Sequence, residues 1–566
     1  MRARHGDADD LGVSAPIANE EHNLQEDHAY AARRAAPTDD SHSDDGRNTL
    51  PNTGVLTTEV EPSDVLSSEE HTKAVVESGT APTDGLARVA ARGAVVTLAG
   101  QAARVVLQLA SVIALARLLT PKDYGLFATV LVVIGIGEIF RDFGLSAAAI
   151  RATTVSREQR TKLFWINTMI GLVLTVLVFA AAPLLAALFS QPLLTSIARV
   201  LAVTFLLNGM SAQYRAGLNR NLRFKSLALS DIVAQAVGLV AGVLFALNGA
   251  GYWSLVAQQL SQVVTVLLML VLMGKWLPGQ YRREVDLSGF LRLGWSLTAT
   301  QLIHYFQSNV DTFTVGLRFG PVSLGLYNRG YQLLMNPLNQ VRTPAATVAI
   351  PVLSRLKDDY VRASAYIRKS QITLGYTIVA GLALAAGSAE PLVMVVLGER
   401  WAPVAPMFAL FSLAGVCQIL AFVGYWVYVS RGLGVELFRY TLVSLTIQVI
   451  CILLGSQWGV IGVAAGFAVA AALEWPLSLW WLARITDYPA RELTFGALRI
   501  LLVVISAGLA TKLVTWLMSD AVAVLSLLCS LVAGLVIMVI AGAISARVRA
   551  DYITVKDFGM KIIRPY

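Results

Sequence analysis

Polar side chains recur at helical spacing along two apolar stretches between Leu297 and Thr343, which a short turn at residues 318–323 joins. The first stretch carries Gln301, His304, Ser308 and Asp311; the second carries Asn328, Gln332, Asn336, Asn339 and Arg342, with Arg329 at the edge. Each set falls on one helix face. A polar face inside a membrane is costly unless it meets water, a partner helix or a substrate. The pair is therefore predicted to form one wall of a hydrated cavity.

Asp311 and Arg329 lie at similar depth in these two stretches. They could form a structural ion pair. They could instead form a gated pair, in which an anionic headgroup takes the arginine and Asp311 is released or protonated. The spacing leaves both interpretations open.

Other apolar stretches also place charges at membrane depth. Arg104 shares a helix face with Gln101 and Gln108, and Glu138 lies one turn before Arg141. The spacing of Glu138 and Arg141 suits a structural i,i+3 pair, and for Arg141 a functional role is equally open. Arg104 and Arg342 have no acidic residue one turn away, so both are predicted to be permanent cations.

Arginines beside amides suit an anionic group that carries many hydroxyls. Arginine binds phosphate with two parallel hydrogen bonds, and amides satisfy sugar hydroxyls. The predicted substrate-binding residues are Arg104, Arg329, Arg342, Gln101, Gln108, Gln301, Asn328, Gln332 and Asn339. The predicted gating or coupling residues are Asp311, Glu138 and Arg141. No nucleotide-binding loop or metal-ligand spacing is found, so no catalytic residue, metal or cofactor is expected.

The composition is that of a membrane protein. Hydrophobic residues make up 55% of the 566 residues and charged residues 14%, against roughly 25% charged in soluble domains. Apolar segments of about 20 residues recur from Arg92 onward, which predicts a polytopic helical protein. The three cysteines all lie inside such segments and show no disulfide or metal spacing.

Residues 1–87 differ from the rest. They hold about six Lys or Arg against eighteen Asp or Glu, few large apolar residues and five of the six histidines. Such a segment buries too little apolar surface to offset its ordering entropy, so we expect a disordered, acidic cytoplasmic tail. The scattered histidines favour a solvated tail over a metal site.

Fourteen membrane spans are predicted, at about 93–119, 125–150, 163–188, 195–215, 227–248, 252–273, 290–317, 322–350, 367–397, 403–429, 436–454, 458–482, 495–518 and 521–545. Alternate loops are rich in Lys and Arg, while the opposite set is nearly bare of them. By the positive-inside rule, this places both termini in the cytoplasm. The outer loops are also very short, which disfavours an enzyme that must hold its substrate on the outer face.

An internal repeat divides the chain. The segment 121–127, Pro-Lys-Asp-Tyr-Gly-Leu-Phe, recurs as Pro-Val-Ser-Leu-Gly-Leu-Tyr at 321–327, six spans later. The copies should therefore be parallel repeats about an axis along the membrane normal. The expected fold is all-α and polytopic. It has an N-terminal lobe at 88–288, a C-terminal lobe at 289–485, and two extra helices with a basic cytoplasmic tail at 486–566.

Several segments resemble one family of membrane proteins. They are Ala116 to Phe127, Asn219 to Lys225, Gly251 to Leu260, Asn309 to Gly316, Gly325 to Gln332, Pro351 to Leu356 and Leu397 to Pro403. As a set covering about residues 93–480, they resemble bacterial polysaccharide exporters of the Wzx type. These exporters belong to the multidrug/oligosaccharidyl-lipid/polysaccharide exporter superfamily, whose fold is MATE-like.

The resemblance implies a non-enzymatic flippase in the inner (plasma) membrane. It would move polyprenyl-pyrophosphate-linked oligosaccharide to the outer leaflet for assembly of lipopolysaccharide, exopolysaccharide or capsule. Implied partners are membrane lipid, a polysaccharide polymerase and glycosyltransferases, and no nucleic acid. The family's cationic cavity fits Arg104, Arg329 and Arg342, whereas the long acidic tail departs from its pattern.

Two alternatives remain at this point. A cation-coupled multidrug exporter of the same fold would favour acidic and aromatic cavity residues over arginines and amides. A non-transporting scaffold or a membrane enzyme is disfavoured by the repeat and the short outer loops.

Overall fold

The structure, a computed structural model, describes residues 83–142, 156–280 and 288–563. Within these ranges the chain is helical and has no strand, which confirms the all-α fold class. Most of the predicted acidic tail lies outside the described residues. Its last five positions, 83–87, already belong to the first described helix.

Within each described range the helices follow one another with short connections. Their bounds are α2 Thr83–Leu118, α3 Pro121–Asp142, α5 Arg157–Leu188, α6 Leu194–Arg220, α7 Phe224–Leu247, α8 Trp253–Gly274, α9 Ser288–Arg355, α10 Tyr360–Leu374, α11 Ala380–Gly387, α12 Ala389–Val396, α13 Ala405–Ser430, α14 Gly434–Gly455, α15 Gly459–Ile485, α16 Ala490–Leu517, α17 Ala523–Ile544 and α18 Ala546–Ile563. A π-helical segment, Gly375–Val379, joins α10 to α11, and 3-10 turns precede α13 and α15.

Ten helical stretches of the described chain are long and apolar enough to cross a membrane, and one of them, Gly434–Ile485, holds both α14 and α15. Helices α2 and α9 are not in that set. Counting α14 and α15 separately and adding α2 and the two halves of α9 gives fourteen segments at the predicted positions; residues 143–150 of the second predicted span lie outside the described residues.

Helix α9 contains the two spans that carry the polar stripes. The backbone leaves the helical conformation at Gly320, where φ is 74°. Only glycine takes this conformation without steric cost. Pro321 follows directly, where its fixed φ and missing N–H suit the start of the second half. The predicted turn between the two spans therefore lies at Gly320.

The two copies of the sequence repeat meet in space. A Cβ atom at Gly125 would collide with the carbonyl oxygen of Pro321, and one at Gly325 would collide with that of Pro121. The contact is reciprocal, as expected of equivalent segments that face each other across an axis. Glycine is needed at both positions because the backbones touch. The lobe boundary near residue 288 stays a prediction.

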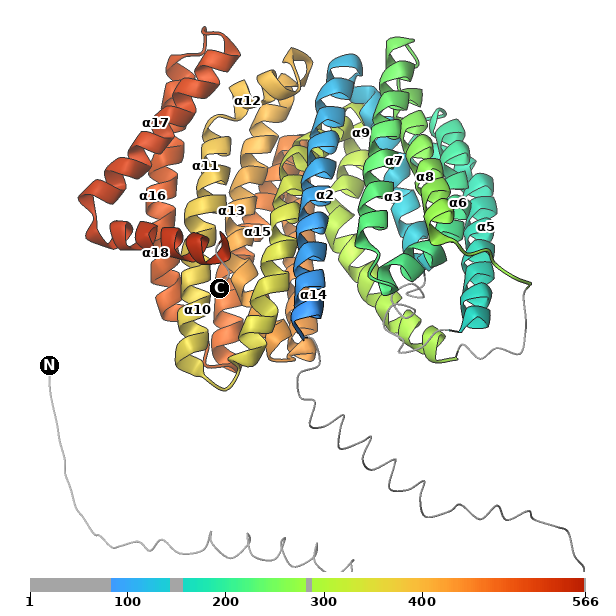
Figure 1. Cartoon of the computed structure of the whole chain (residues 1–566). Coiled ribbons are helices and arrows are strands. Elements are labelled where there is room, and N and C mark those ends of the chain that lie inside the picture. The colour runs from blue at the N-terminus through green and yellow to red at the C-terminus, as the bar shows by residue number, and fades with distance from the viewer. Residues whose placement is uncertain (1–82, 143–155, 281–287, 564–566) are drawn as a thin grey trace, which may run out of the picture. The chain divides into compact units, whose positions relative to one another are not determined.

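Figure 1 shows the first half of the bundle, α3 and α5–α8, beside the second half, α10–α15, with α2 and α9 between them. Within the first half α5 packs on α6 and α7 on α8, and α3 packs along α9. Leu184, Leu272 and many other large apolar side chains point outward. An apolar outer surface is what a bundle surrounded by lipid requires.

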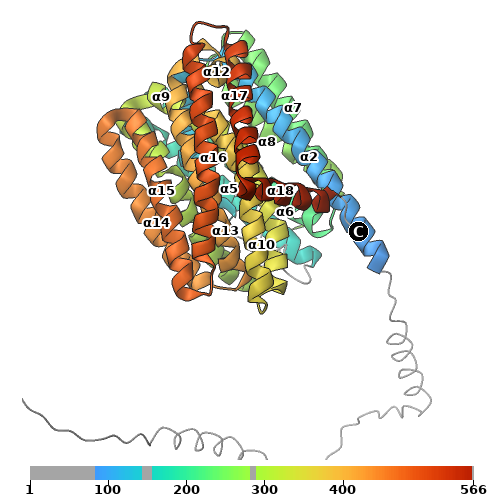
Figure 2. The ribbon, with the colours of Figure 1, turned by 90° about the vertical axis from the view of Figure 1, so that its left-hand side faces the viewer.

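The C-terminal helices α16, α17 and α18 follow the two halves of the bundle and pack on the second half. Helices α16 and α17 pack on each other, and α16 packs on α11. The predicted basic tail is in fact helix α18, which lies across the other helices in both views (Figures 1 and 2). Arg499 of α16 donates from Nε and Nη2 to the carboxylate of Asp551, 2.7 Å each, and so anchors α18. Burial, with Asp551 beside it, raises the pKa of the Tyr552 phenol.

Candidate functional site

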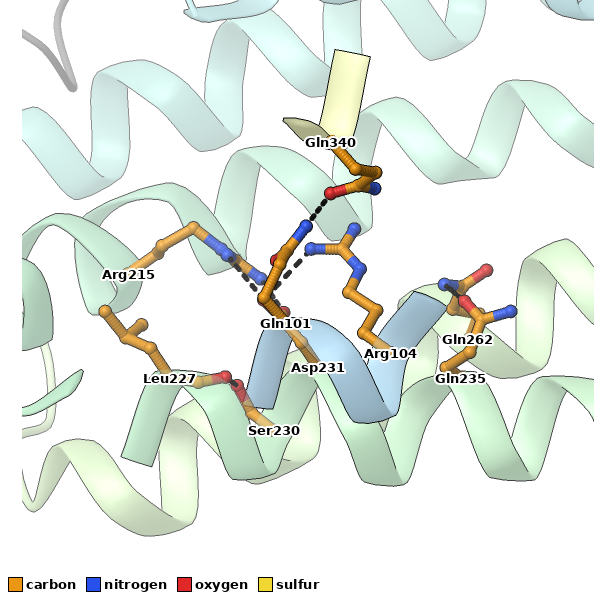
Figure 3. Close-up of polar contacts among 9 residues, drawn as sticks. All are labelled: Gln101, Arg104, Arg215, Leu227, Ser230, Asp231, Gln235, Gln262 and Gln340. Atoms are coloured by element: carbon orange, nitrogen blue, oxygen red, sulfur yellow. Dashed lines mark hydrogen bonds and ion pairs between the residues drawn. The ribbon is translucent and has the colours of Figure 1, made fainter. Parts of the chain in front are cut away.

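One carboxylate in α7 is shared by two arginines from two other helices (Figure 3). Arg215 of α6 places Nη2 2.5 Å from Oδ1 of Asp231 and Nη1 3.4 Å from Oδ2. Arg104 of α2 places Nη1 3.5 Å from the same Oδ2. The arginine side chains are 43% and 44% exposed, and that of Asp231 19%. The two arginines and Asp231 together carry one net positive charge, and both arginine side chains are partly exposed.

The cluster lines a cavity of about 590 Å³ between α2, α3, α6, α7 and α8. Its lining residues are Arg104, Glu138, Arg141, Asn208, Ser211, Ala212, Arg215, Ala216, Asn219, Asp231, Gln259, Gln262, Val263 and Val266. Three arginines therefore face two carboxylates and four side-chain amides. The volume suits a ligand of several sugar or phosphate units.

A second ion pair in the cavity lies within one helix turn. Arg141 donates from Nε to Glu138 at 2.5 Å, which is the i,i+3 pair expected from the spacing. Asn208 of α6 donates to the other oxygen of Glu138 at 2.8 Å, and its carbonyl accepts from Arg141 at 3.2 Å. Glu138 is thus held by one cation and one amide. This pair is neutral, so the excess charge of the cavity comes from the cluster around Asp231.

Amides on α8 are held by neighbouring helices. Gln262 donates to Gln235 of α7 at 2.8 Å, as Figure 3 shows. Gln258 donates to the hydroxyl of Ser111 on α2 at 2.6 Å. Gln262 lines the cavity and Gln258 does not, so the first contact positions a cavity amide before any ligand arrives and the second joins α8 to α2.

The predicted residues of α2 and α9 meet at a tight seam. The amide of Gln101 donates to that of Gln340 on α9 (Figure 3). Further along, Gln108 and Gln332 line a gap of only about 10 Å³. Such a volume holds one water at most. Gln101 therefore links α2 to α9, Gln108 and Gln332 line only the small gap, and none of the three lines the large cavity.

The possible ion pair between Asp311 and Arg329 does not form. Asp311 is fully buried and accepts from the phenol of Tyr327 at 2.7 Å and from the backbone N–H of Thr312 at 2.7 Å. Tyr327 and Arg329 are two residues apart, which is roughly 200° around a helix. When Tyr327 faces Asp311, Arg329 must therefore face away from it.

Arg329 instead lies against α3. It is 9% exposed, and its guanidinium carbon lies 3.5 Å from the ring centroid of Tyr124. Tyr124 makes an edge contact with Trp401, whose indole donates to the carbonyl of Ala116 at 2.8 Å. These contacts join the beginning of α3 to the second half of α9 and to the turn before α13.

The remaining predicted residues of α9 are dispersed. Arg342 lies 4.6 Å from the ring centroid of Phe422 on α13. Gln301 and Asn339 are exposed, while Asn328 is partly buried. In the part of the chain that the structure describes, none of these four lines the 590 Å³ cavity.

The structure thus brings together Arg104, Glu138 and Arg141 of the predicted set and adds Arg215 and Asp231 to them. No acidic residue lies one turn from Arg104, as the sequence indicated, but Asp231 approaches it from 127 positions away, which no helical spacing reveals. Asp231 falls inside a predicted span, where an unpaired charge is costly. The sequence alone therefore indicates that Asp231 needs a partner. Arg215 lies at the end of a predicted span, so the sequence does not distinguish it from the other arginines and lysines at the predicted membrane boundaries.

An all-helical membrane bundle whose repeated segments meet, with a charged cavity in its first half, defines a membrane transporter fold. The structure called "Lipid II flippase MurJ, inward closed conformation" matches with a TM-score of 0.62 at 14% identity, over 83% of this chain and 99% of that one. An inward-facing multidrug resistance MATE family transporter of the MOP superfamily matches with a TM-score of 0.54 at 15% identity, over 69% and 98%. At these identities the likeness shows the fold alone.

The family model for polysaccharide biosynthesis proteins matches residues 114–406, and the chain belongs to that family. It is 24% identical over 375 residues to the lipopolysaccharide biosynthesis protein WzxC of Escherichia coli (strain K12), covering 64% of this chain and 75% of that protein. It is 23% identical over 359 residues to the teichuronic acid biosynthesis protein TuaB of Bacillus subtilis (strain 168), covering 62% and 73%. The resemblance to Wzx-type polysaccharide flippases is confirmed.

Proposed function

We propose that this transporter moves a polyprenyl-pyrophosphate-linked oligosaccharide from the inner to the outer leaflet by alternating access. The observation that carries the proposal is the 590 Å³ cavity, in which three arginines and four amides converge. Similar proteins support it, because their names place them in lipopolysaccharide, teichuronic acid and succinoglycan biosynthesis.

The cavity chemistry suits such a headgroup. A sugar hydroxyl left without a partner in an apolar medium costs a few kcal/mol, so the headgroup cannot cross lipid unaided. Arg104 and Arg215 would hold the diphosphate, since guanidinium groups bind phosphate bidentately. Asn208, Asn219 and Gln262 would replace the water around the sugars. The prenyl chain would stay in lipid.

The polar residues of α9 take a secondary place in this proposal. Gln301 and Asn339 are exposed and Arg342 is partly exposed, so they would contact more distant sugars when the two halves of the bundle move. Arg329, Asn328 and Asp311 would maintain the packing between helices. We further propose that both termini lie in the cytoplasm of a cell with an inner (plasma) membrane, where a polymerase and glycosyltransferases would supply and use the substrate.

The test is transbilayer movement in liposomes that contain the purified protein. Two cargoes are compared: a polyprenyl-pyrophosphate oligosaccharide and a lipophilic cation drug. We expect the lipid-linked sugar to move and the drug to stay. Movement of the drug alone would contradict the proposal and indicate multidrug export.

A further inference from the structure

We propose that Asp231 is a competing counter-ion, which occupies the arginines of the empty cavity and displaces the diphosphate at release. The inference rests on the proposed function, because it concerns the same cavity. It assigns the carboxylate a role distinct from holding the helices together.

The geometry of the cluster is unequal. Arg215 approaches both oxygens of Asp231, with contacts of 2.5 and 3.4 Å. Arg104 reaches one oxygen from 3.5 Å, at the limit of a hydrogen bond. Each guanidinium has five N–H donors, so a single carboxylate leaves most of them free. An anion entering the cavity can therefore contact Arg104 first and then compete for Arg215.

The charges favour replacement of Asp231 by the diphosphate over binding of both anions to the arginines at once. The two arginines and Asp231 together carry one positive charge, whereas a diphosphate carries about two negative charges or more at neutral pH. The arginines balance the diphosphate only when Asp231 moves aside, since like charges a few ångströms apart repel. The side chain of Asp231 is itself 19% exposed at the cavity surface, so water is within reach of the displaced carboxylate.

The other carboxylate in the cavity lacks this property. Glu138 is held by Arg141 on its own helix and by the amide of Asn208. Arg141 in turn donates to the carbonyl of Asn208. The side chain of Arg141 is only 13% exposed, against 43% and 44% for Arg104 and Arg215, so an entering anion reaches the cation on Glu138 less readily. Asp231 and Glu138 can therefore be compared directly. We expect an anion to displace Asp231 from its arginines and to leave Glu138 in place.

Return of Asp231 to its arginines would expel the bound anion. A transport site must bind well enough to load and weakly enough to unload. Without the carboxylate, the cluster would keep two uncompensated cations and hold the diphosphate tightly. Asp231 thus lowers the affinity of the cavity for the diphosphate and speeds its release.

The experiment measures binding of farnesyl pyrophosphate to the purified full-length protein, together with transport of the polyprenyl-pyrophosphate oligosaccharide in liposomes. We expect Asp231→Asn to bind about tenfold more tightly, as loss of one competing charge-assisted contact predicts, and to transport more slowly. Asp231→Glu should restore both values toward wild type. Glu138→Gln also removes one negative charge from the cavity, but the cation that it frees is only 13% exposed, so we expect a smaller gain in affinity than for Asp231→Asn.

Three other outcomes are distinct. Weaker or unchanged binding by Asp231→Asn, with binding lost in Arg104→Ala/Arg215→Ala, would overturn the counter-ion role and leave the proposed function intact. An equal gain in Glu138→Gln would show a general charge effect and also overturn the inference. If folded wild-type protein binds no farnesyl pyrophosphate, the proposed diphosphate site itself is wrong. Thermal unfolding of each variant establishes that it is folded.

Discussion

Two polar regions of this bundle differ in what their charges can do. In the cavity, Arg104, Arg215 and Asp231 come from three helices, and their arginines are partly open to water. In α9, Asp311 is fully buried against Tyr327, and Arg329 is buried under the ring of Tyr124. Both regions place ionisable groups within the bundle, but only the first leaves them room to change partners.

The difference shows that burial, more than residue type, separates a binding site from a structural contact. A buried carboxylate whose hydrogen bonds are satisfied resists any exchange, because the unpaired state is costly. A half-exposed ion pair contributes little to stability and can be replaced at small cost. The cavity cluster is therefore suited to a ligand, and the buried groups of α9 are suited to packing.

The largest expected effect is on the cavity arginines. Arg104→Ala/Arg215→Ala should reduce transport of the lipid-linked oligosaccharide on the order of 100-fold, since it removes two charge-assisted contacts worth about 1.5 kcal/mol each. Arg342→Ala, on α9, should reduce it much less. Liposome transport measured at equal protein content checks both. A greater loss in Arg342→Ala would place the diphosphate on α9 instead.

Exchanging the charges of Asp311 and Arg329 tests the buried region. The double variant Asp311→Arg/Arg329→Asp would restore function if the two residues formed an ion pair. Because they face different neighbours, we expect the double variant to be as defective in folding as either single variant. Yield and size-exclusion profiles after purification measure this. Recovery in the double variant would contradict the partners assigned here.

The sequence predicted more of the fold than of the site. Hydropathy predicted the fourteen spans, and the repeat at Pro121 and Pro321 predicted segments that the structure brings into contact. The pair of Glu138 and Arg141 was accessible because its members lie one turn apart. Helix α18 was not predicted, since it is short and carries charges throughout.

The spacing of residues along one helix could not predict two features of the site. Arg104 and Asp231 come from helices far apart in the chain, so their contact depends on the packing of α2 on α7. Asp311 and Arg329 were predicted to lie at similar depth, but depth does not specify which way a side chain points around its helix. Tyr327 lies two positions from Arg329 and takes the place beside Asp311.

A smaller effect is expected from the phenol that binds Asp311. Tyr327→Phe leaves one buried carboxylate oxygen without that donor and should lower the free energy of unfolding by about 1–3 kcal/mol. Tyr124→Phe is the matched control, because the buried Tyr124 hydroxyl has no hydrogen-bond partner among the described residues. Thermal unfolding followed by tryptophan fluorescence should show a lower Tm only for Tyr327→Phe. Equal shifts would contradict the assigned hydrogen bond.

The smallest effect concerns the seam between α2 and α9. Gln101→Leu removes the side-chain contact to Gln340 without adding a charge. One hydrogen bond in a partly buried position contributes about 1 kcal/mol, so transport should change by less than about fivefold. A complete loss of transport would show that the seam takes part in substrate binding.

The most direct test of the central claim locates the diphosphate. Val266→Cys lies in the cavity lining at a partly exposed position, and Asn339→Cys lies on the exposed face of α9. Each is introduced after Cys417, Cys451 and Cys529 are replaced by Ala, and its rate of maleimide labelling is measured with and without farnesyl pyrophosphate. We expect the ligand to protect residue 266 and to leave residue 339 unchanged. Protection of residue 339 alone would contradict the central claim.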